Sequence, residues 1–299
     1  DVDVEDYRGD IVQVDESYSG VAEIEVDADV IEELYDSGKV LVPELEGIIN
    51  QYLILKGPGS ASGLARVAEE GPDPVAVRVP GARHMFGVET KNVRQAFAAD
   101  LLLDPAISAV SLMGMAGTGK TFLSLAAALE QVMELGRYRR VSVYRPLVAV
   151  GRQEVGFLPG DLHEKLEPWM AAVHDNLYAL FGGDGSNPRD AVDELFERDI
   201  LEMAAVTYLR GRSITGELVI VDEAQNLELP TLKVILTRIA TDSKVVFCGD
   251  LSQVDNPYVS PFGGLAALIE KFKGNPMFGH VALERTVRSP LAELATQLL

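Results

Sequence analysis

Cysteine is nearly missing from this chain, because Cys248 is the only one among 299 residues. A single cysteine excludes an internal disulfide framework and a cysteine-based metal site, which fits a reducing cytoplasm. Long apolar runs are missing as well, and none approaches the roughly 20 residues that a membrane-spanning helix needs. No signal peptide is recognisable. With 47% hydrophobic residues, the sequence predicts a soluble, cytoplasmic globular protein with no membrane partner.

Basic residues are scarce relative to acidic ones, with 26 Lys and Arg against 46 Asp and Glu and a formal net charge of −20. Spread over the whole surface, this charge would repel RNA and DNA. The excess is concentrated, however, because residues 1–46 carry 16 acids and two bases, whereas residues 47–299 carry 30 acids and 24 bases. The charge therefore argues against nonspecific binding of polyanions and leaves room for local arginine contacts.

Two segments of different pattern follow one another along the chain. Residues 1–80 contain short β-rich runs broken by Gly, Pro and Ser turns, which predict a small acidic β-barrel or β-sandwich. In residues 81–299, short apolar strands alternate with helices, as is typical of a parallel sheet with crossover helices. An insertion at residues 151–214 interrupts this pattern. The expected strands of the sheet are Ser108–Met113, Arg140–Tyr144, Leu218–Val221, Val245–Cys248 and His280–Leu283.

The segment Gly114–Thr121 matches G-x-x-x-x-G-K-[ST], the pattern of a phosphate-binding loop, between an expected strand and an expected helix over residues 122–135. Its glycines allow backbone N–H groups to wrap around phosphates, and the helix dipole favours negative charge. Lys120 is expected to reach the β- and γ-phosphates, and Thr121 to ligate Mg²⁺. The residues expected to hold the nucleotide are Gly114, Met115, Ala116, Gly117, Thr118, Gly119, Lys120 and Thr121.

Two further strands end in polar residues, at the sheet edge where ligands bind in open α/β sheets. Asp222 would hold Mg²⁺ through its water shell, and Glu223 would orient and deprotonate the attacking water. Gln253 would contact the γ-phosphate or that water. The alternatives are two solvated acids and a simple turn at Asp250 and Ser252. A glutamate at this place predicts that the nucleotide is hydrolysed.

Together these blocks resemble superfamily 1 helicases and, more closely, the PhoH-like ATPase family, from about residue 82 to the C-terminus. The resemblance implies an α/β P-loop NTPase of the RecA-like kind, a parallel sheet with flanking helices preceded by a small mainly-β domain, that hydrolyses ATP with Mg²⁺. It also implies that Gln95 reads the adenine edge, which favours ATP over GTP. The alternative for Gln95 is a polar residue at a helix start. The motifs are Thr90–Gln95, Gly114–Thr121, Arg145-Pro146, Gly156–Gly160, Arg210–Ser213, Val221–Asn226, Gly249–Gln253 and Glu284–Pro290.

The N-terminal block resembles the region between a PIN nuclease domain and a PhoH ATPase, through residues 50–56 and 63–66. This resemblance implies that a PIN domain precedes Asp1 in a longer chain. The absence of an initial Met and the apolar helical pattern at the end fit the same interpretation. The acids at positions 1, 3, 5 and 6 are spaced like a solvated tail, so we predict no nuclease activity for this piece.

A single phosphate loop gives the chain one nucleotide-binding core, whereas monomeric translocating helicases place ATP between two. A head-to-tail ring of identical subunits, a hexamer by the family resemblance, would supply the second wall and an arginine in trans. Arg285 and Arg288 are the candidates, and the resemblance favours Arg288. The alternative is that both pair with surface acids.

Local arginines are the expected contacts to single-stranded RNA, because a ring would repeat them around a pore. They are Arg137, Arg139, Arg140, Arg145, Arg210 and Arg212. The alternative is that the first three cap a helix and the last two pair with acids. The sequence thus predicts an oligomeric, Mg²⁺-dependent ATPase that unwinds or remodels RNA. An ATP-dependent assembly factor that acts on a protein partner is the alternative, and a nucleotide kinase is disfavoured by the Asp222-Glu223 and Gly249–Gln253 motifs.

Overall fold

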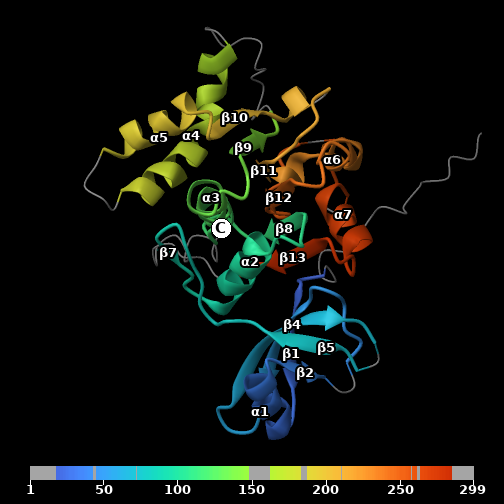
Figure 1. Ribbon diagram of the computed structural model, residues 1–299. Coiled ribbons are helices and arrows are strands. Elements are labelled where there is room, and N and C mark those ends of the chain that lie inside the picture. Colours follow the sequence, from blue (N-terminus) through green and yellow to red (C-terminus); the bar gives the residue numbers. More distant parts are fainter. Residues whose placement is uncertain are drawn as a thin grey trace, which may run out of the picture.

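A computed structural model describes residues 18–42, 45–71, 73–147, 162–182, 187–209, 211–256, 258–260 and 263–284. In this part the chain forms an N-terminal module, a larger module around a parallel sheet, and a two-stranded ribbon between them in sequence (Figure 1). The ribbon consists of β6 (His84–Met85) and β7 (Val88–Glu89). None of the helices in the described part is both long and apolar enough to cross a membrane.

The N-terminal module is a five-stranded sheet with one helix packed on it. Its strands follow the order β1-β3-β4-β5-β2, with β1 parallel to β3 and the other ladders antiparallel. Helix α1 (Ala28–Ser37) buries Ile31 and Leu34 in the core of this module. The described strands thus form one sheet covered by a helix, where the sequence favours a barrel or a sandwich. The strands are β1 (Val21–Glu25), β2 (Lys39–Leu41), β3 (Tyr52–Lys56), β4 (Ser62–Glu69) and β5 (Val75–Arg78).

The larger module is built on a six-stranded sheet in the order β10-β9-β11-β12-β8-β13, with every ladder parallel. All residues of β8, β11 and β12 are buried, as expected for continuous apolar runs that are covered on both faces. The five strands expected from the sequence are confirmed, and β10 adds a sixth from within the insertion. The strands are β8 (Ala109–Met113), β9 (Arg140–Arg145), β10 (Leu201–Ala205), β11 (Glu217–Val221), β12 (Lys244–Gly249) and β13 (Phe278–Ala282).

Helices cover both faces of this sheet (Figure 1). Successive strand residues point to opposite faces, so Val110 and Leu112 join one hydrophobic core while Ala109 and Met113 join the other. The first core is closed by α2 (Val93–Leu103), α3 (Lys120–Leu129), α4 (Leu162–Phe181) and α5 (Pro188–Glu197). The second is closed by α6 (Leu229–Leu236) and α7 (Leu265–Phe272). A π-helical turn (Glu130–Glu134) extends α3, and 3₁₀ turns (Val206–Leu209 and Ala224–Asn226) follow β10 and β11.

The N-terminal module is fixed to the parallel-sheet module by contacts to α2, its C-cap Asp104 and β13. The Tyr52 ring stacks on Phe97 with 4.3 Å between centroids, and its hydroxyl donates to Asp100 Oδ2 at 2.8 Å. Arg66 pairs with Asp104 at 2.7 Å. Asn50 Nδ2 donates to the carbonyl of Phe278 at 2.8 Å. The two modules therefore share a specific interface that includes the helix leading toward the phosphate loop.

Candidate nucleotide-binding site

The loop between β8 and α3 depends on its glycines for its path. Gly114, Gly117 and Gly119 have φ values of 150°, 84° and 95°, a region that other residues rarely adopt. A Cβ atom on Gly114 would lie 2.3 Å from the carbonyl oxygen of Leu283, so no side chain fits there. Gly119 then begins α3 as its N-cap. The phosphate-binding motif therefore lies between a strand and a helix, as its chemistry requires.

Lys120 bends back over this loop. Its Nζ donates to the carbonyls of Gly114 and Met115, the second at 3.0 Å. The Thr118 side chain is buried and donates to the same Met115 carbonyl at 2.9 Å. The ammonium group therefore lies at the loop that it is expected to complete around phosphates.

Thr121 and Asp222 meet at the carboxyl edge of the sheet. Thr121 Oγ1 donates to Asp222 Oδ1 at 2.7 Å, and Arg145 Nε lies 3.3 Å from Asp222 Oδ2. Burial raises the pKa of Asp222, while the charge of Arg145 and the Thr121 hydrogen bond act in the opposite direction. A hydroxyl and a carboxylate side by side are the hard oxygen ligands that Mg²⁺ prefers.

Glu223 occupies a strained backbone position with both carboxylate oxygens held. Its φ of 54° lies in the left-handed region, which is rare for a residue other than glycine. Gln225 Nε2 donates to Glu223 Oε2 at 2.6 Å, and Arg145 Nη2 lies 3.1 Å from Oε1. Sequence reasoning missed Gln225 and assigned Arg145 to RNA. The Asp-Glu-Ala-Gln-Asn motif contains Gln225, but only the fold shows that its side chain reaches back to Glu223.

Gln225 also ties the β11 edge to the β12 edge. Its Nε2 donates to the carbonyl of Gln253 at 3.0 Å, and its Oε1 accepts from the backbone N–H of Asp250 at 3.1 Å. Asp250 Oδ1 accepts from both the N–H and the hydroxyl of Ser252, so the expected turn is present. The other oxygen, Oδ2, is buried and has no hydrogen-bond partner in the described part of the chain. Asp250 is thus both a turn residue and an unsatisfied acceptor at the site.

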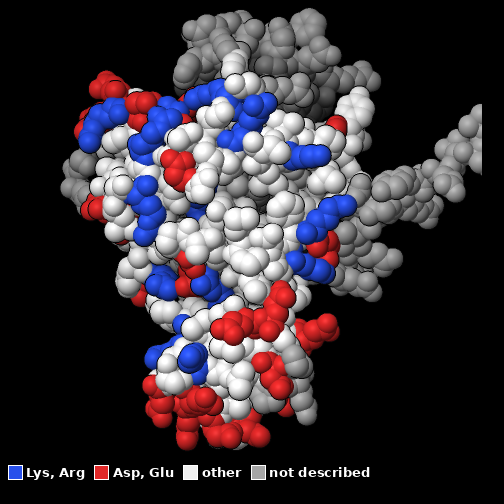
Figure 2. Space-filling model, turned by 45° about the vertical axis from the view of Figure 1, so that its right-hand side comes forward, with Lys and Arg blue, Asp and Glu red and all other residues white. Residues whose placement is uncertain are grey.

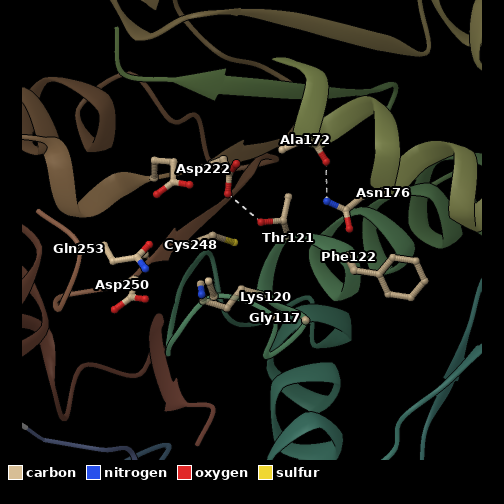
Figure 3. A pocket seen from close by; sticks show the side chains of 14 residues that line it. Gly117, Lys120, Thr121, Phe122, Ala172, Asn176, Asp222, Cys248, Asp250 and Gln253 are labelled. Carbon is tan, nitrogen blue, oxygen red and sulfur yellow. Dashed lines mark hydrogen bonds between the residues drawn. The ribbon is translucent and has the colours of Figure 1, made fainter. Parts of the chain in front are cut away.

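A pocket with a volume of about 350 Å³ lies beside the phosphate loop and the carboxyl ends of β11 and β12 (Figure 3). Lys120, Thr121, Asp222, Glu223 and Gln253 come together there as the sequence predicts. Gly114, Met115 and Thr118 belong to the loop but do not line the pocket. The further lining residues are Ala116, Gly117, Gly119, Phe122, Ala172, Asn176, Cys248, Gly249 and Asp250.

Gln95 lies behind the phosphate loop with its amide already bonded. The side chain is 4% exposed; its Oε1 accepts from the Lys91 N–H at 2.9 Å and its Nε2 donates to the Thr118 carbonyl at 3.1 Å. Asn92 caps the start of α2 by accepting from the Gln95 N–H. In this structure Gln95 therefore braces the loop from α2, and its contact to adenine stays a prediction.

The arginines that begin β9 are neutralised within the chain. Arg140 is 7% exposed and pairs with Asp199 at 2.8 Å and Glu217 at 2.9 Å. Arg139 also pairs with Glu217, and Arg212 pairs with Glu202 at 2.8 Å. The Arg212 pair matches the alternative stated for it, whereas Arg139 and Arg140 bind acids instead of capping a helix. Arg137 donates to the Leu103 carbonyl and to Gln131, whereas Arg210, Arg285 and Arg288 lie outside the described residues.

Cys248 reaches the pocket wall without the properties of a nucleophile. Its side chain is buried, and its Sγ lies 3.2 Å from Ser124 Oγ. Burial raises the pKa of the thiol to about 12, so it is not a thiolate at neutral pH. Cys248 is therefore a packing residue of β12.

Comparisons with known proteins find relatives of this chain in sequence. The chain is 40% identical over 300 residues to Protein PhoH2 of Thermobispora bispora, covering 100% of this chain and 66% of that protein. It is 39% identical over 301 residues to Protein PhoH2 of Bacillus subtilis, covering 99% and 67%. The chain thus spans about two thirds of the length of these relatives. The solved Pif1 helicase from Candida albicans matches 70% of this chain and 43% of its own at 15% identity, with a TM-score of 0.34.

A family model described as PhoH-like protein matches residues 87–299, the segment that holds the parallel sheet and every residue of the pocket. Together with the phosphate loop and the sheet, this match makes the larger module a P-loop NTPase module. The chain belongs to the PhoH-like protein family.

Proposed function

We propose that this chain is a Mg²⁺-dependent ATP hydrolase in which Glu223 activates the attacking water. The observation that carries this proposal is the convergence of Lys120, Thr121, Asp222 and Glu223 on one pocket. A protein that only binds nucleotide needs the first three of these residues, whereas hydrolysis needs a group that orients water at the γ-phosphate.

Thr121 and Asp222 would hold the metal. Bound Mg²⁺ neutralises charge on the β- and γ-phosphates. The described part of the chain contains no cluster of three or more His, Cys, Asp or Glu residues suited to a metal ion. A site with one hydroxyl and one carboxylate fits a cation that also takes ligands from phosphate and water.

The hydrogen bonds of the Glu223 carboxylate support its proposed role. Gln225 and Arg145 each bind one of its carboxylate oxygens, which fixes the orientation of the group. The same Gln225 binds the Gln253 carbonyl, so Glu223 and the predicted γ-phosphate contact belong to one hydrogen-bonded unit. Loss of the γ-phosphate would therefore change the hydrogen bonding of Gln253 and of Glu223 together.

A Glu223→Gln variant tests the hydrolytic assignment. We expect ATP turnover to fall by roughly 10²–10⁴-fold, the usual contribution of a general base, while ATP binding persists. The matched control is Glu228→Gln, which changes an exposed acid five residues further along the same segment. Near-normal turnover of Glu223→Gln in a Mg²⁺-ATP assay would overturn the assignment.

The finer proposal is a ring of subunits, a hexamer by the family resemblance, that unwinds or remodels single-stranded RNA. One nucleotide core per chain supports a ring, because a neighbouring subunit would supply the missing wall and Arg288 or Arg285. An N-terminal PIN domain in the full-length protein is part of the same expectation. Stimulation of turnover by single-stranded RNA at low salt, on material of measured oligomeric mass, supports the motor; turnover by a proven monomer excludes the shared site.

A second candidate is an ATP-dependent assembly factor for a protein partner. The internal pairing of Arg139, Arg140 and Arg212 favours it, because these side chains offer little unpaired positive charge to RNA. Acidic side chains also gather on the N-terminal module in Figure 2, where α1 exposes Asp29, Glu32, Glu33 and Asp36. Turnover that RNA does not change at any salt concentration would favour this candidate.

A further inference from the structure

Asp250 carries a buried acceptor that the proposed hydrolytic residues leave unused. It directly follows β12, which pairs with β8 on one side and with β11 on the other, so it lies between the strands that lead to the phosphate loop and to Glu223. The residue is 6% exposed and lines the nucleotide pocket. Its Oδ1 accepts from the N–H and the hydroxyl of Ser252, whereas Oδ2 has no hydrogen-bond partner among the described residues.

The donor for Oδ2 has to arrive with the ligand, because a buried carboxylate oxygen without a partner costs free energy. Figure 3 shows the Asp250 carboxylate in the pocket, on the side where Lys120 and Gln253 lie. Phosphate oxygens are acceptors and cannot satisfy it. Lys120 donates to the carbonyls of Gly114 and Met115 here and is expected to turn to the phosphates when they bind. The remaining donor at this end of the pocket is water.

Gln225 sets the spacing between Asp250 and Glu223. Its Nε2 donates to Glu223 Oε2 at 2.6 Å, and its Oε1 accepts from the Asp250 N–H at 3.1 Å. A Cβ atom on Gly249 would lie 3.1 Å from the same Oε1, so the amide packs directly on the end of β12. Two carboxylates that follow neighbouring strands are therefore joined through one side-chain amide at the same pocket.

We propose that Asp250 is a catalytic residue that accepts one hydrogen bond from the attacking water while Glu223 accepts the other. The inference rests on the proposed function, because it needs Glu223 as the base. A water held by two carboxylates turns a lone pair toward the γ-phosphorus. As its oxygen bonds to phosphorus, the bond from phosphorus to the leaving ADP oxygen breaks. Glu223 takes one proton, and the other stays on the new phosphate oxygen, directed at Asp250.

An Asp250→Asn variant tests this role, because it keeps Oδ1 for the turn and replaces Oδ2 with an N–H donor. We expect ATP turnover to fall by about 10²-fold. Binding of ADP, Mg²⁺ and AlF₄⁻, which together mimic the transition state with its water, should weaken by at least about tenfold, whereas binding of adenylyl imidodiphosphate should not weaken. Asp255→Asn makes the same change at an exposed position of the same segment and should alter none of these values.

Two other roles for Asp250 give different results. If it only holds the turn, Ser252→Ala, which removes the hydroxyl contact to Oδ1, lowers turnover as much as Asp250→Asn does. If it binds a water of the metal ion, Asp250→Asn raises the Mg²⁺ concentration at half-maximal turnover and leaves the maximal turnover unchanged. Either result overturns the proposal, as does turnover by Asp250→Asn within about twofold of the wild type.

The unmodified chain provides a test that does not depend on the folding of a variant. In a crystal structure with ADP, Mg²⁺ and AlF₄⁻, the water opposite the ADP oxygen should lie within about 3.2 Å of both Glu223 and Asp250. A water held by Glu223 and Gln253 without Asp250 overturns the proposal. If Asp250→Asn is fully active and Glu223→Gln is not, this inference fails and the proposed function stands. If both variants are fully active, the proposed function itself fails.

Discussion

Charged residues have different surroundings at the two edges of the parallel sheet. At the amino edge, Arg140 is enclosed by Asp199 and Glu217, and its charge is neutralised within the chain. At the carboxyl edge, Asp222 and Glu223 share Arg145 and line an open pocket with Lys120. Similar ion pairs thus hold the fold at one edge and prepare a ligand site at the other. The number of arginines in a segment therefore does not locate a binding surface. What matters is the edge of the sheet at which each arginine lies.

A second contrast concerns one lysine at each edge, Lys244, which is buried, and Lys120, which is partly exposed. Lys244, the first residue of β12, donates through Nζ to the carbonyls of Leu101, Leu102 and Asp104 at 2.7–2.8 Å and so closes the end of α2. Lys120 binds loop carbonyls that a phosphate can replace as its partner. The first lysine has no exchangeable role, whereas the second is expected to change partners during each cycle.

Replacing Lys120 should produce the largest effect and should separate activity from stability. Lys120→Ala removes the cation at the γ-phosphate, so turnover should fall on the order of 10³-fold, as for loss of one transition-state donor. The melting temperature should not fall, because the lysine's partners are loop carbonyls. Lys233→Ala, at an exposed position on α6, is the control. A variant that unfolds more easily instead would make the carboxyl edge structural.

The reverse result is expected at the amino edge. Glu217→Gln removes the charge that faces Arg139 and Arg140 and weakens the contact from Ser142 Oγ, which is 2.6 Å long. Leaving a buried guanidinium partly unpaired should lower the free energy of unfolding by about 1–3 kcal/mol. Urea denaturation measures this loss, and ATP turnover should stay unchanged at a temperature where the variant is folded. Loss of turnover without loss of stability would contradict the division between the edges.

Lys244 makes the amino edge sensitive to pH. Burial lowers its pKa to about 7, with Arg137 and Arg66 acting in the same direction and Asp104 and Asp100 opposing it. The unfolded chain, with a lysine pKa of about 10.4, binds more protons between pH 7 and 10, so stability should rise with pH across that window. Below pH 7 both states are protonated and the effect is constant.

A Lys244→Met variant isolates the pH-dependent contribution of this lysine to stability. The stability of the wild type minus that of Lys244→Met, from urea denaturation, should rise by about 2 kcal/mol between pH 7 and pH 9, at up to about 1.4 kcal/mol per pH unit. A flat difference would mean that the lysine stays charged among its three carbonyls. Lys271→Met, on the exposed side of α7, controls for general effects of charge.

The sequence predicts the carboxyl edge better than the amino edge, for a physical reason. The phosphate loop and Asp222-Glu223 are local patterns, since each lies in one strand end and the parallel topology brings strand ends together. Glu217 to Arg140 and Gln225 to Gln253 are contacts between distant segments, and no periodicity encodes them. Whether a helix or a second sheet covers β1–β5 depends on packing that pattern alone does not fix.

A substitution of Gln95 should have the smallest effect, and it tests whether this residue positions the phosphate loop or contacts the base. Gln95→Leu keeps the size of the side chain but removes the bonds to the Lys91 N–H and the Thr118 carbonyl. Two neutral hydrogen bonds are worth about 1–2 kcal/mol together, and their loss should loosen the attachment of the phosphate loop to α2. A brace predicts weaker binding of both ATP and tripolyphosphate, about fivefold each, because the loop itself is less ordered. A glutamine that reads the base predicts that ATP binding weakens alone, with tripolyphosphate unaffected. Titration of both ligands on Gln95→Leu therefore decides whether the amide acts on the loop, as its present partners indicate, or on the purine.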